Sequence, residues 1–278
     1  MSVNAGGKPI VTDKLVHLLD PLSNVCYPSG SDELENHFSE GHVKSLTGGF
    51  GTNLRSSTQT GFTTSGLADY GAETDHQRQK GYWTADGSSD YLTREATSNA
   101  YLPIKGGLTG QNYPSALTFG GWFKCSSLNS TTRYLFGFGN TGYSNDYYCT
   151  AYINSSGYPY YQSEPGTNSY NTSITTSIED DTWHLWFVRI RGTSSSQWKF
   201  QLFIDGGLWG SSSEQTQSPG TYIGGNSNMK VYSIGTVRRS TYQNSHLGDI
   251  GPHYIYAKAL STAEMQQNYF ALKDRFNF

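Results

Sequence analysis

Carboxylates are the first residues to test for chemistry, because a glycosidase needs one carboxyl group as an acid and a second as a nucleophile or base. One arrangement that supplies them from a single strand is Glu-x-Asp-x-x-Glu. Glu73 and Asp75 begin such a string, but Arg78 stands where its last Glu should be. The acidic cluster at 32–35 lies in a polar segment, and we expect it to be a solvated face. The chain also lacks the Gly-x-Ser-x-Gly elbow of serine hydrolases. We therefore predict that the protein is not an enzyme.

Oxygen ligands for calcium are a second possibility. Four aspartates stand at the ends of predicted strands, where carboxylates and backbone carbonyls could hold the ion together: Asp86, Asp90, Asp205 and Asp249. The chain has no Asp-x-Asp-x-Asp string, and an aspartate at a strand end commonly caps a turn by accepting hydrogen bonds from local amides. We predict no cofactor and keep calcium as the weaker alternative.

Tyrosine is concentrated between residues 143 and 170, among Asn, Ser and Gly. Tyrosine offers a broad contact area at low entropic cost, and small polar residues adapt their hydrogen bonds, so this mixture suits a protein interface or a sugar platform. The alternative is that half of the rings alternate on two ordinary strands. The candidate contact residues are Tyr143, Tyr147, Tyr148, Tyr158, Tyr160, Tyr161 and Trp209. Trp209 would stack on a ligand if exposed, or close one end of the fold if buried.

The cysteines and histidines give no metal-binding pattern. Cys26, Cys125 and Cys149 allow one disulfide, but free thiols are the favoured interpretation. No Cys-x-x-Cys or His-rich spacing indicates zinc. His184 follows Trp183 on a predicted core strand, where a single histidine is usually structural.

Composition limits the class of protein. Only 35% of the residues are hydrophobic, but 14% are aromatic, and the chain has 21 tyrosines and 32 glycines. This is typical of many short strands joined by polar turns. The net charge of −3 and the absence of a basic run predict no nucleic-acid or membrane partner. We also expect no signal peptide and no transmembrane segment.

The predicted fold is organised around a hairpin at 183–205. Its second arm alternates well: Trp198, Phe200, Leu202 and Ile204 share one face, and Phe203 is the one apolar residue on the other face. Its first arm, at 183–190, is apolar on nearly both faces, as expected for a strand between two layers. The hairpin predicts the centre of a β-sandwich.

Further strands are predicted at 10–19, 81–93, 117–124, 133–139, 221–223, 231–237 and 249–257. Pro252 predicts a bulge or an edge position, and the glycines at 120 and 121 predict close approach of another backbone or of a bulky ring. One helix is predicted at 262–275, with a capping box formed by Ser261 and Glu264 and an apolar stripe made by Met265, Tyr269, Leu272 and Phe276. The fold class is therefore an all-β antiparallel sandwich with one C-terminal helix. We expect residues 1–9 to form an arm and 10–278 one domain, with an irregular insertion at about 52–80.

Several of these segments, in this order, resemble laminin-G-like, concanavalin-A-like jelly-roll domains. The resemblance is carried by the turn at 86–91, the strand at 117–124, the Trp183-His184 pair, the segment 202–206 and the segments at 249–251 and 259–261. The opening at 8–28 and the tail at 259–276 are similar to the versions found in structural proteins of tailed, cyanobacterial bacteriophages. Two segments depart from the pattern, the insertion at 52–80 and the tyrosine-rich segment.

The resemblance implies a phage virion structural protein, displayed on the particle surface as a capsid decoration or tail appendage and contributing to adhesion to the host surface. It also implies other virion proteins and further copies of the chain as partners, and a host-surface glycan as a possible ligand. The alternatives are a free carbohydrate-binding lectin and, less favoured, a polysaccharide-degrading enzyme. We expect the N-terminal segments to tether the protein to the particle and the tyrosine-rich face to meet a neighbouring copy or a glycan.

Overall fold

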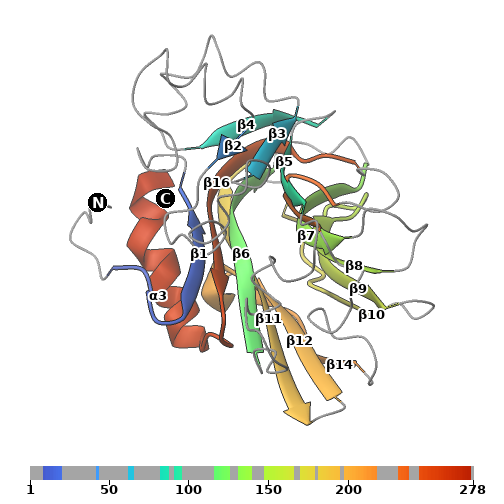
Figure 1. The fold of residues 1–278 in the computed structure, drawn as a ribbon, viewed down its shortest axis with the longest axis vertical. Helices are drawn as coiled ribbons and strands as arrows, with labels where there is room; N and C mark the ends of the chain where they lie inside the picture. The colour runs from blue at the N-terminus through green and yellow to red at the C-terminus, as the bar shows by residue number, and fades with distance from the viewer. Residues whose placement is uncertain are drawn as a thin grey trace.

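The computed structural model describes residues 9–20, 42–43, 62–65, 82–87, 91–95, 116–125, 131–139, 147–165, 170–178, 181–194, 197–217, 231–237 and 244–276. These residues form two antiparallel β-sheets and one C-terminal α-helix (Figure 1). The predicted fold class is confirmed. Residues 1–8 of the expected arm at 1–9 and the strand at 221–223 lie outside the described residues, as does most of the insertion.

Sheet A has the strand order β1-β16-β6-β11-β12-β13, with β14 also paired to β12 and β4 also paired to β16. Its strands are β1 (Leu15–Leu19), β4 (Trp83–Asp86), β6 (Ala116–Cys125), β11 (Trp183–Ser194), β12 (Gln197–Ile204), β13 (Gly210–Ser211), β14 (Gln215–Gln217) and β16 (Leu247–Tyr256). The central hairpin is therefore β11–β12, with Val188 opposite Leu202.

Sheet B has the order β10-β9-β8-β7-β15-β5-β3-β2. Its strands are β2 (His42–Val43), β3 (Phe62–Ser65), β5 (Tyr91–Glu95), β7 (Arg133–Gly139), β8 (Tyr147–Ile153), β9 (Pro159–Pro165), β10 (Tyr170–Ser173) and β15 (Val231–Ile234). The two strands predicted within 81–93 exist, but β4 joins sheet A and β5 joins sheet B.

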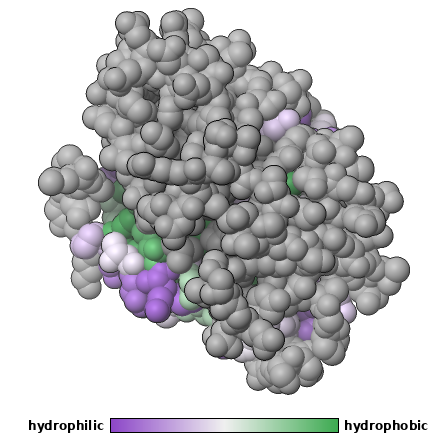
Figure 2. All heavy atoms as spheres, in the orientation of Figure 1, coloured by the Kyte–Doolittle hydropathy of each residue, from purple (hydrophilic) through white to green (hydrophobic). Residues whose placement is uncertain are grey.

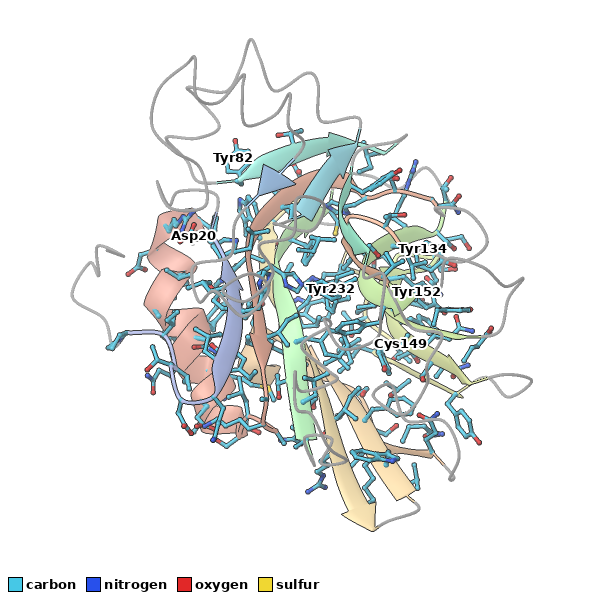
Figure 3. The ribbon with its side chains drawn as sticks, in the orientation of Figure 1. Asp20, Tyr82, Tyr134, Cys149, Tyr152 and Tyr232 are labelled. Atoms are coloured by element: carbon cyan, nitrogen blue, oxygen red, sulfur yellow. The ribbon has the colours of Figure 1, made fainter. Side chains whose placement is uncertain are left out.

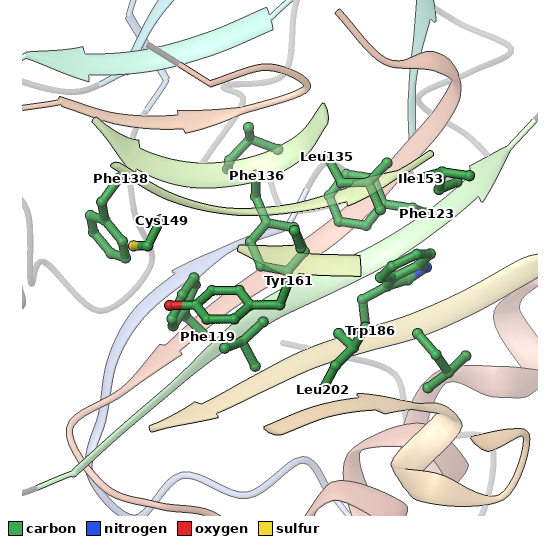
Figure 4. Packing of buried hydrophobic residues seen from close by; sticks show 14 of the residues in the cluster. Phe119, Phe123, Leu135, Phe136, Phe138, Cys149, Ile153, Tyr161, Trp186 and Leu202 are labelled. Atoms are coloured by element: carbon green, nitrogen blue, oxygen red, sulfur yellow. The ribbon is translucent and has the colours of Figure 1, made fainter. Parts of the chain in front are cut away.

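An inner core fills the space between the two sheets. Sheet A contributes Phe119, Phe123, Trp186 and Leu202, and sheet B contributes Phe136, Phe138 and Tyr161, as Figure 4 shows. The rings meet edge-to-face, for example Phe119 and Phe138 with centroids 5.1 Å apart. Burying each large apolar side chain contributes roughly 1.5–3 kcal/mol relative to exposure.

A second core, which we call the helix-side core, lies on the outer face of sheet A. It joins strand residues to α3 (Thr262–Leu272) and to the 3₁₀ turn that follows it, η5 (Lys273–Phe276). Strand β11 contributes side chains to both cores, because successive residues point to opposite faces of the sheet. Trp186, Val188 and Ile190 face sheet B, and Trp183, Leu185 and Phe187 face the helix. The prediction of a strand between two layers is thus confirmed. Phe203 is the exception on β12 because it joins the helix-side core, where the Arg189 guanidinium lies 4.6 Å from its ring centroid.

The helix begins as the sequence predicts. The Ser261 side chain accepts a hydrogen bond from the Glu264 amide, and Glu264 Oε2 accepts one from the Ser261 amide at 2.8 Å, which completes the capping box. Met265, Leu272 and Phe276 are buried against sheet A, and Tyr269 packs beside them. The stripe therefore docks the helix, and η5 ends one residue past the expected limit.

Two backbone features on β6 and β16 follow the predictions. The pairing of these strands shifts register between Ile250 and His253, which is the expected bulge at Pro252. Gly120 has φ +155, and a Cβ there would lie 1.9 Å from the Trp186 carbonyl oxygen. Only glycine permits that approach, which lets β6 pack directly against β11.

The first strand differs from its prediction. Strand β1 begins at Leu15 rather than at residue 10, because Lys14 adopts a left-handed φ of 58°. Before it, the Val11 amide donates to Asn268 Oδ1 on α3 at 2.7 Å, and the Val11 carbonyl accepts from the Tyr256 hydroxyl. The segment 9–12 is thus held by the helix instead of by a sheet.

Cys125 and Cys149 are buried thiols rather than a disulfide, as predicted for these two residues, and Cys26 lies outside the described residues. Burial raises the pKa of the Cys149 thiol to about 12. No helix in the described part of the chain is long and apolar enough to cross a membrane.

Candidate functional site

Three tyrosines lie side by side on the outer face of sheet B. Tyr134 on β7 pairs with Tyr152 on β8, and Tyr152 pairs with Tyr160 on β9. The alternating residues of these strands, such as Ala151 and Tyr161, point into the inner core. The three tyrosines therefore point to the opposite side, where each is half-buried.

A bulge places Tyr134 in this row. The pairing of β7 with β8 shifts register between Tyr134 and Phe136, so that Leu135 and Phe136 both enter the inner core. Without the extra residue, Tyr134 and Phe136 would share a face, because strand side chains have a period of two. Figure 3 shows Tyr134 and Tyr152 together on the side of the molecule away from α3.

The rings form one continuous row. The centroids of Tyr134 and Tyr152 are 5.5 Å apart with planes tilted by 49°, and those of Tyr152 and Tyr160 are 5.4 Å apart and stacked at 22°. Burial, followed by the charges of Tyr134, Tyr160 and Glu164, raises the pKa of Tyr152 well above its usual value. Its hydroxyl therefore stays protonated at neutral pH and can donate a hydrogen bond.

Two polar residues extend the row along β9. Gln162 and Glu164 follow Tyr160 at two-residue steps, so all three share the outer face. The Gln162 Nε2 group donates to Glu164 Oε1 at 2.8 Å. We call the set Tyr134, Tyr152, Tyr160, Gln162 and Glu164 the tyrosine face.

The tyrosine face combines the elements of a small-molecule platform. Aromatic rings with a partly negative face attract the C–H groups of an apolar ligand surface, and an amide and a carboxylate fix its orientation by hydrogen bonds. A pyranose ring presents such an apolar C–H surface with hydroxyl groups around its edge. The geometry is thus chemically suited to a sugar.

The predicted contact residues separate into several environments. Tyr160 belongs to the tyrosine face, and Tyr158 is half-buried at the β8–β9 turn, where its amide donates to Asn154 Oδ1. Tyr161 is fully buried in the inner core and Tyr148 is 2% exposed, so neither offers its ring to a partner in this structure. Tyr143 lies outside the described residues, and of Tyr147 only the backbone is described.

Trp209 also has a structural environment. It packs against the inner core, and its ring centroid lies 5.4 Å from that of His184 in an edge-to-face contact. It is half-buried, so it is neither the fully exposed stacking surface nor the fully buried end residue of the two expectations.

The residues of the tyrosine face that were not among the predicted contacts are Tyr134, Tyr152, Gln162 and Glu164. Alternation with the apolar residues Cys149, Ala151 and Ile153 is the signal that places Tyr152 outward. No comparable signal exists for Tyr134, because its orientation depends on the bulge.

The calcium candidates have protein partners. Asp249 accepts from the Thr84 hydroxyl at 2.8 Å and lies 3.2 Å from the Lys124 ammonium. Of Asp86 only the backbone is described, and Asp90 lies outside the described residues. No group of three or more His, Cys, Asp or Glu residues that could hold a metal occurs in the described part of the chain.

Asp205 takes part in a buried relay at the end of the central hairpin. Its Oδ2 lies 2.7 Å from His184 Nδ1, and its Oδ1 accepts from the Leu185 amide at 2.8 Å. His184 Nε2 lies 2.9 Å from the Thr182 hydroxyl. Asp205 itself has a left-handed φ of 54°. The relay ties the turn after β12 to the start of β11, a structural role that agrees with the prediction for His184.

The relay also has the order hydroxyl, imidazole, carboxylate that hydrolases use to activate a nucleophile. Thr182 is exposed, whereas His184 and Asp205 are buried. With Nδ1 donating to Asp205, neutral His184 accepts from Thr182 at Nε2. Sequence reasoning did not find this arrangement, because its members are separated by a strand pair and follow no motif.

Similar folds occur among solved structures. The K499G mutant of NanB sialidase from Streptococcus pneumoniae matches with 16% identity and a TM-score of 0.49, over 66% of this chain and 27% of that one. The CBM40 of the Ruminococcus gnavus IT-sialidase, bound to alpha2,3 sialyllactose, matches with 20% identity and a TM-score of 0.44, over 55% of this chain and 81% of that one. This chain thus spans about a quarter of the NanB sialidase.

No curated protein matches the chain. Residues 86–266 match the family described as the concanavalin A-like lectin/glucanases superfamily, and the matched range contains strands β5 to β16 and the start of α3. This match covers more than half of the sequence, and it agrees with the resemblance carried by the motifs at 117–124, 183–184 and 202–206. The chain belongs to the concanavalin A-like lectin/glucanases superfamily.

Proposed function

We propose that this chain is a non-enzymatic glycan-binding domain displayed on the surface of a phage virion, as a capsid decoration or a tail appendage. The observation that carries the glycan-binding part is the tyrosine face: three tyrosine rings in one row, ending at a hydrogen-bonded amide and carboxylate. The lectin-like fold is compatible with that role. Fold alone does not determine function, so the proposal depends on the site.

The position of the helix favours this face over its counterpart. On the outer face of sheet A, Trp122 stacks on Tyr269 at 5.6 Å and lies 4.9 Å from Phe276, so α3 and η5 cover the aromatic residues there. Tyr134, Tyr152 and Tyr160 of sheet B keep part of their surface accessible. Of the two outward aromatic surfaces described, the tyrosine face is thus the one available to a ligand.

A glycan array probed with the isolated protein tests the binding proposal. We expect specific hits, and we expect Tyr152→Ala and Tyr160→Ala each to weaken them about tenfold, because removal of a ring central to a contact commonly costs over 1 kcal/mol. Phe270→Ala is the matched control, since Phe270 is the exposed aromatic residue on α3. A protein that binds no glycan, or whose binding is unaffected by the tyrosine variants, contradicts the proposal.

The virion part of the proposal rests on the similarity of the opening and tail segments to phage structural proteins. The position of Pro9, the first described residue, is compatible with a tether. The Pro9 carbonyl accepts from Gln267 Nε2 at 2.7 Å, so the chain enters the domain beside α3, on the side away from the tyrosine face (Figure 1). Attachment through the N-terminal segment would leave the tyrosine face directed outward.

Mass spectrometry of purified particles tests the location, and deletion of Met1–Pro9 tests the tether. We expect the chain in particles, and we expect the truncated protein to fold yet fail to join them. Normal assembly of the truncated protein, or loss of assembly in a Tyr160→Ala, Tyr161→Ala double variant with an intact N-terminus, would reverse the two roles. Because Tyr161 is a core residue, Tyr160→Ala alone must accompany the double variant.

A hydrolytic role is the alternative that the Thr182–His184–Asp205 relay favours, and Glu164 is the carboxylate that a polysaccharide-degrading role would use. Both are tested by product release from polysaccharides and acyl esters. We expect no product from the native protein. Release that stops in Thr182→Ala would establish an acyl hydrolase, and release that stops in Glu164→Gln would establish a glycosidase. A free lectin would keep glycan binding and be missing from particles.

A further inference from the structure

Charge at the tyrosine face narrows the class of ligand. We infer that this face selects neutral or amino sugars and discriminates against anionic ones, such as sialic acids, uronic acids and sulfated sugars, with Glu164 as the residue that sets this specificity. The inference rests on the proposed glycan binding and goes further by naming which sugars bind.

The carboxylate is an integral part of the face. Glu164 follows Tyr160 and Gln162 on the same side of β9, and Oε1 is held at 2.8 Å by the Gln162 amide group. That bond holds the carboxylate beside Gln162 on the tyrosine face. A carboxylate only accepts hydrogen bonds, so it suits the hydroxyl groups of a neutral sugar or the ammonium group of an amino sugar.

The field of Glu164 reaches the rings. Its negative charge is one of the causes, after burial and the neighbouring tyrosines, that raise the pKa of Tyr152. A ligand stacked on Tyr152 and Tyr160 would therefore experience the same negative charge. A second carboxylate placed there, or a sulfate, would be repelled.

The cation that adjoins Tyr134 in the sequence is held by other partners. Arg133 precedes Tyr134 on β7, but its Nη1 donates to the Gly87 and Ser245 carbonyl oxygens. Among the ion pairs of the described residues, Glu164 takes part in none, whereas Glu214 on sheet A pairs with Arg191 and Lys199. Recognition of an anionic sugar usually uses an arginine or lysine, and the described part of the tyrosine face presents a carboxylate instead.

Solvent limits how strongly Glu164 can discriminate against anionic sugars. Glu164 is half-buried, and the interaction of partly exposed charges is on the order of 1 kcal/mol or less, which corresponds to about fivefold in affinity at low salt. Because the Debye length falls from about 10 Å at 0.1 M salt to about 3 Å at 1 M, high salt should remove most of the discrimination.

The experiment uses an array of galactose-, glucose-, mannose- and N-acetylglucosamine-terminated oligosaccharides, each printed beside its sialylated or sulfated form. We expect the native protein to bind uncharged members, with each anionic counterpart about fivefold weaker at low salt. Glu164→Gln should raise binding of the anionic counterparts to the level of the neutral ones, and Glu164→Lys should reverse the preference. Glu214→Gln is the matched control, because it changes the net charge equally on sheet A and should leave the preference unchanged.

The outcomes separate this inference from the proposed function. Anionic glycans that bind as well as neutral ones, with loss on Tyr152→Ala and no change on Glu164→Gln, overturn the inference and leave glycan binding intact. Binding that is independent of Tyr152 and Tyr160, or no binding to any glycan, overturns both. An equal change in preference for Glu214→Gln and Glu164→Gln would assign the effect to net charge and also overturn the role of Glu164.

Discussion

The outer faces of the two sheets both carry aromatic side chains, but those side chains are buried on sheet A and partly exposed on sheet B. On sheet A, the side chains of Trp122, Tyr254 and Tyr256 are completely buried beneath α3 and its neighbours. On sheet B, Tyr134, Tyr152 and Tyr160 are only half-buried. Figure 2 shows part of the region over α3 and β1, where hydrophobic and hydrophilic residues adjoin. An aromatic strand face is therefore a core or a candidate binding surface according to what covers it.

On the covered face of sheet A, a buried tyrosine hydroxyl has hydrogen-bond partners within the protein. On sheet A, the Tyr256 hydroxyl donates to the Val11 carbonyl and accepts from Asn268 Nδ2 at 3.0 Å, so its burial is compensated. This network joins the N-terminal segment, β16 and α3, and the bidentate pair of Asp20 and Arg275 adds a further link across the same face. The covered face thus stabilises the fold, and we assign ligand binding to the other.

The largest expected effect is on the covered face. Trp122→Ala removes a fully buried ring that stacks on Tyr269 and packs against Phe276, and we expect a loss of about 3–5 kcal/mol in the free energy of unfolding. Urea denaturation followed by circular dichroism measures it. A loss below about 1 kcal/mol would mean that α3 does not dock on sheet A in solution.

Acid should lower the stability of the fold through two histidines that are buried between the sheets. Burial lowers the pKa of His253 to about 3 and that of His246 to about 4, from an ordinary value of 6.5. Between these values and 6.5 the unfolded chain binds protons that the folded chain does not, so stability falls as the pH falls through this window. The slope is about 1.4 kcal/mol per pH unit for each histidine, or about 2 kcal/mol each by pH 5.

Urea denaturation of the native protein and of His253→Gln at pH 7, 6 and 5 checks this dependence. Each variant is compared with itself at pH 7, since the substitution also changes the contact between residue 253 and the Tyr232 hydroxyl. We expect His253→Gln to lose about half as much stability on acidification as the native protein. Equal losses would show that His253 is protonated in the folded state.

Removal of the helix cap should have a smaller effect on the covered face. Ser261→Ala deletes the side chain that accepts from the Glu264 amide, and we expect a loss of about 1 kcal/mol in stability by thermal or urea unfolding. Ser261→Gly is the matched control, because glycine at this position costs only a few tenths of a kcal/mol. Glycan binding should be unchanged in both variants, and a change would link α3 to the ligand site.

The smallest effect on stability is expected at the open face. Tyr160→Ala removes a half-buried ring that stacks on Tyr152, and we expect a loss of about 1 kcal/mol or less in the free energy of unfolding, together with the loss of glycan binding described above. A smaller stability loss for Tyr160→Ala than for Trp122→Ala would support the difference between the open and the covered face. A loss as large as that of Trp122→Ala would identify the tyrosine face as a structural surface.

The sequence by itself determined the local structure. Period-two alternation in β12, apolar residues on both faces of β11 and the capping box of α3 are all local patterns, and each predicted its element correctly. The glycines at 120 and 121 and Pro252 likewise predicted the close approach and the bulge on β6 and β16. These features depend only on backbone sterics and on the spacing of neighbouring residues.

Only the tertiary structure decided which tyrosines form a surface. The row of Tyr134, Tyr152 and Tyr160 depends on the register of three strands and on the bulge after Tyr134, and both are long-range properties of the sheet. Tyr160 and Tyr161 are neighbours in sequence, yet one faces outward and the other lies in the inner core. The face that α3 covers is likewise set by packing between distant segments, so the candidate site could not be separated from the core by composition alone.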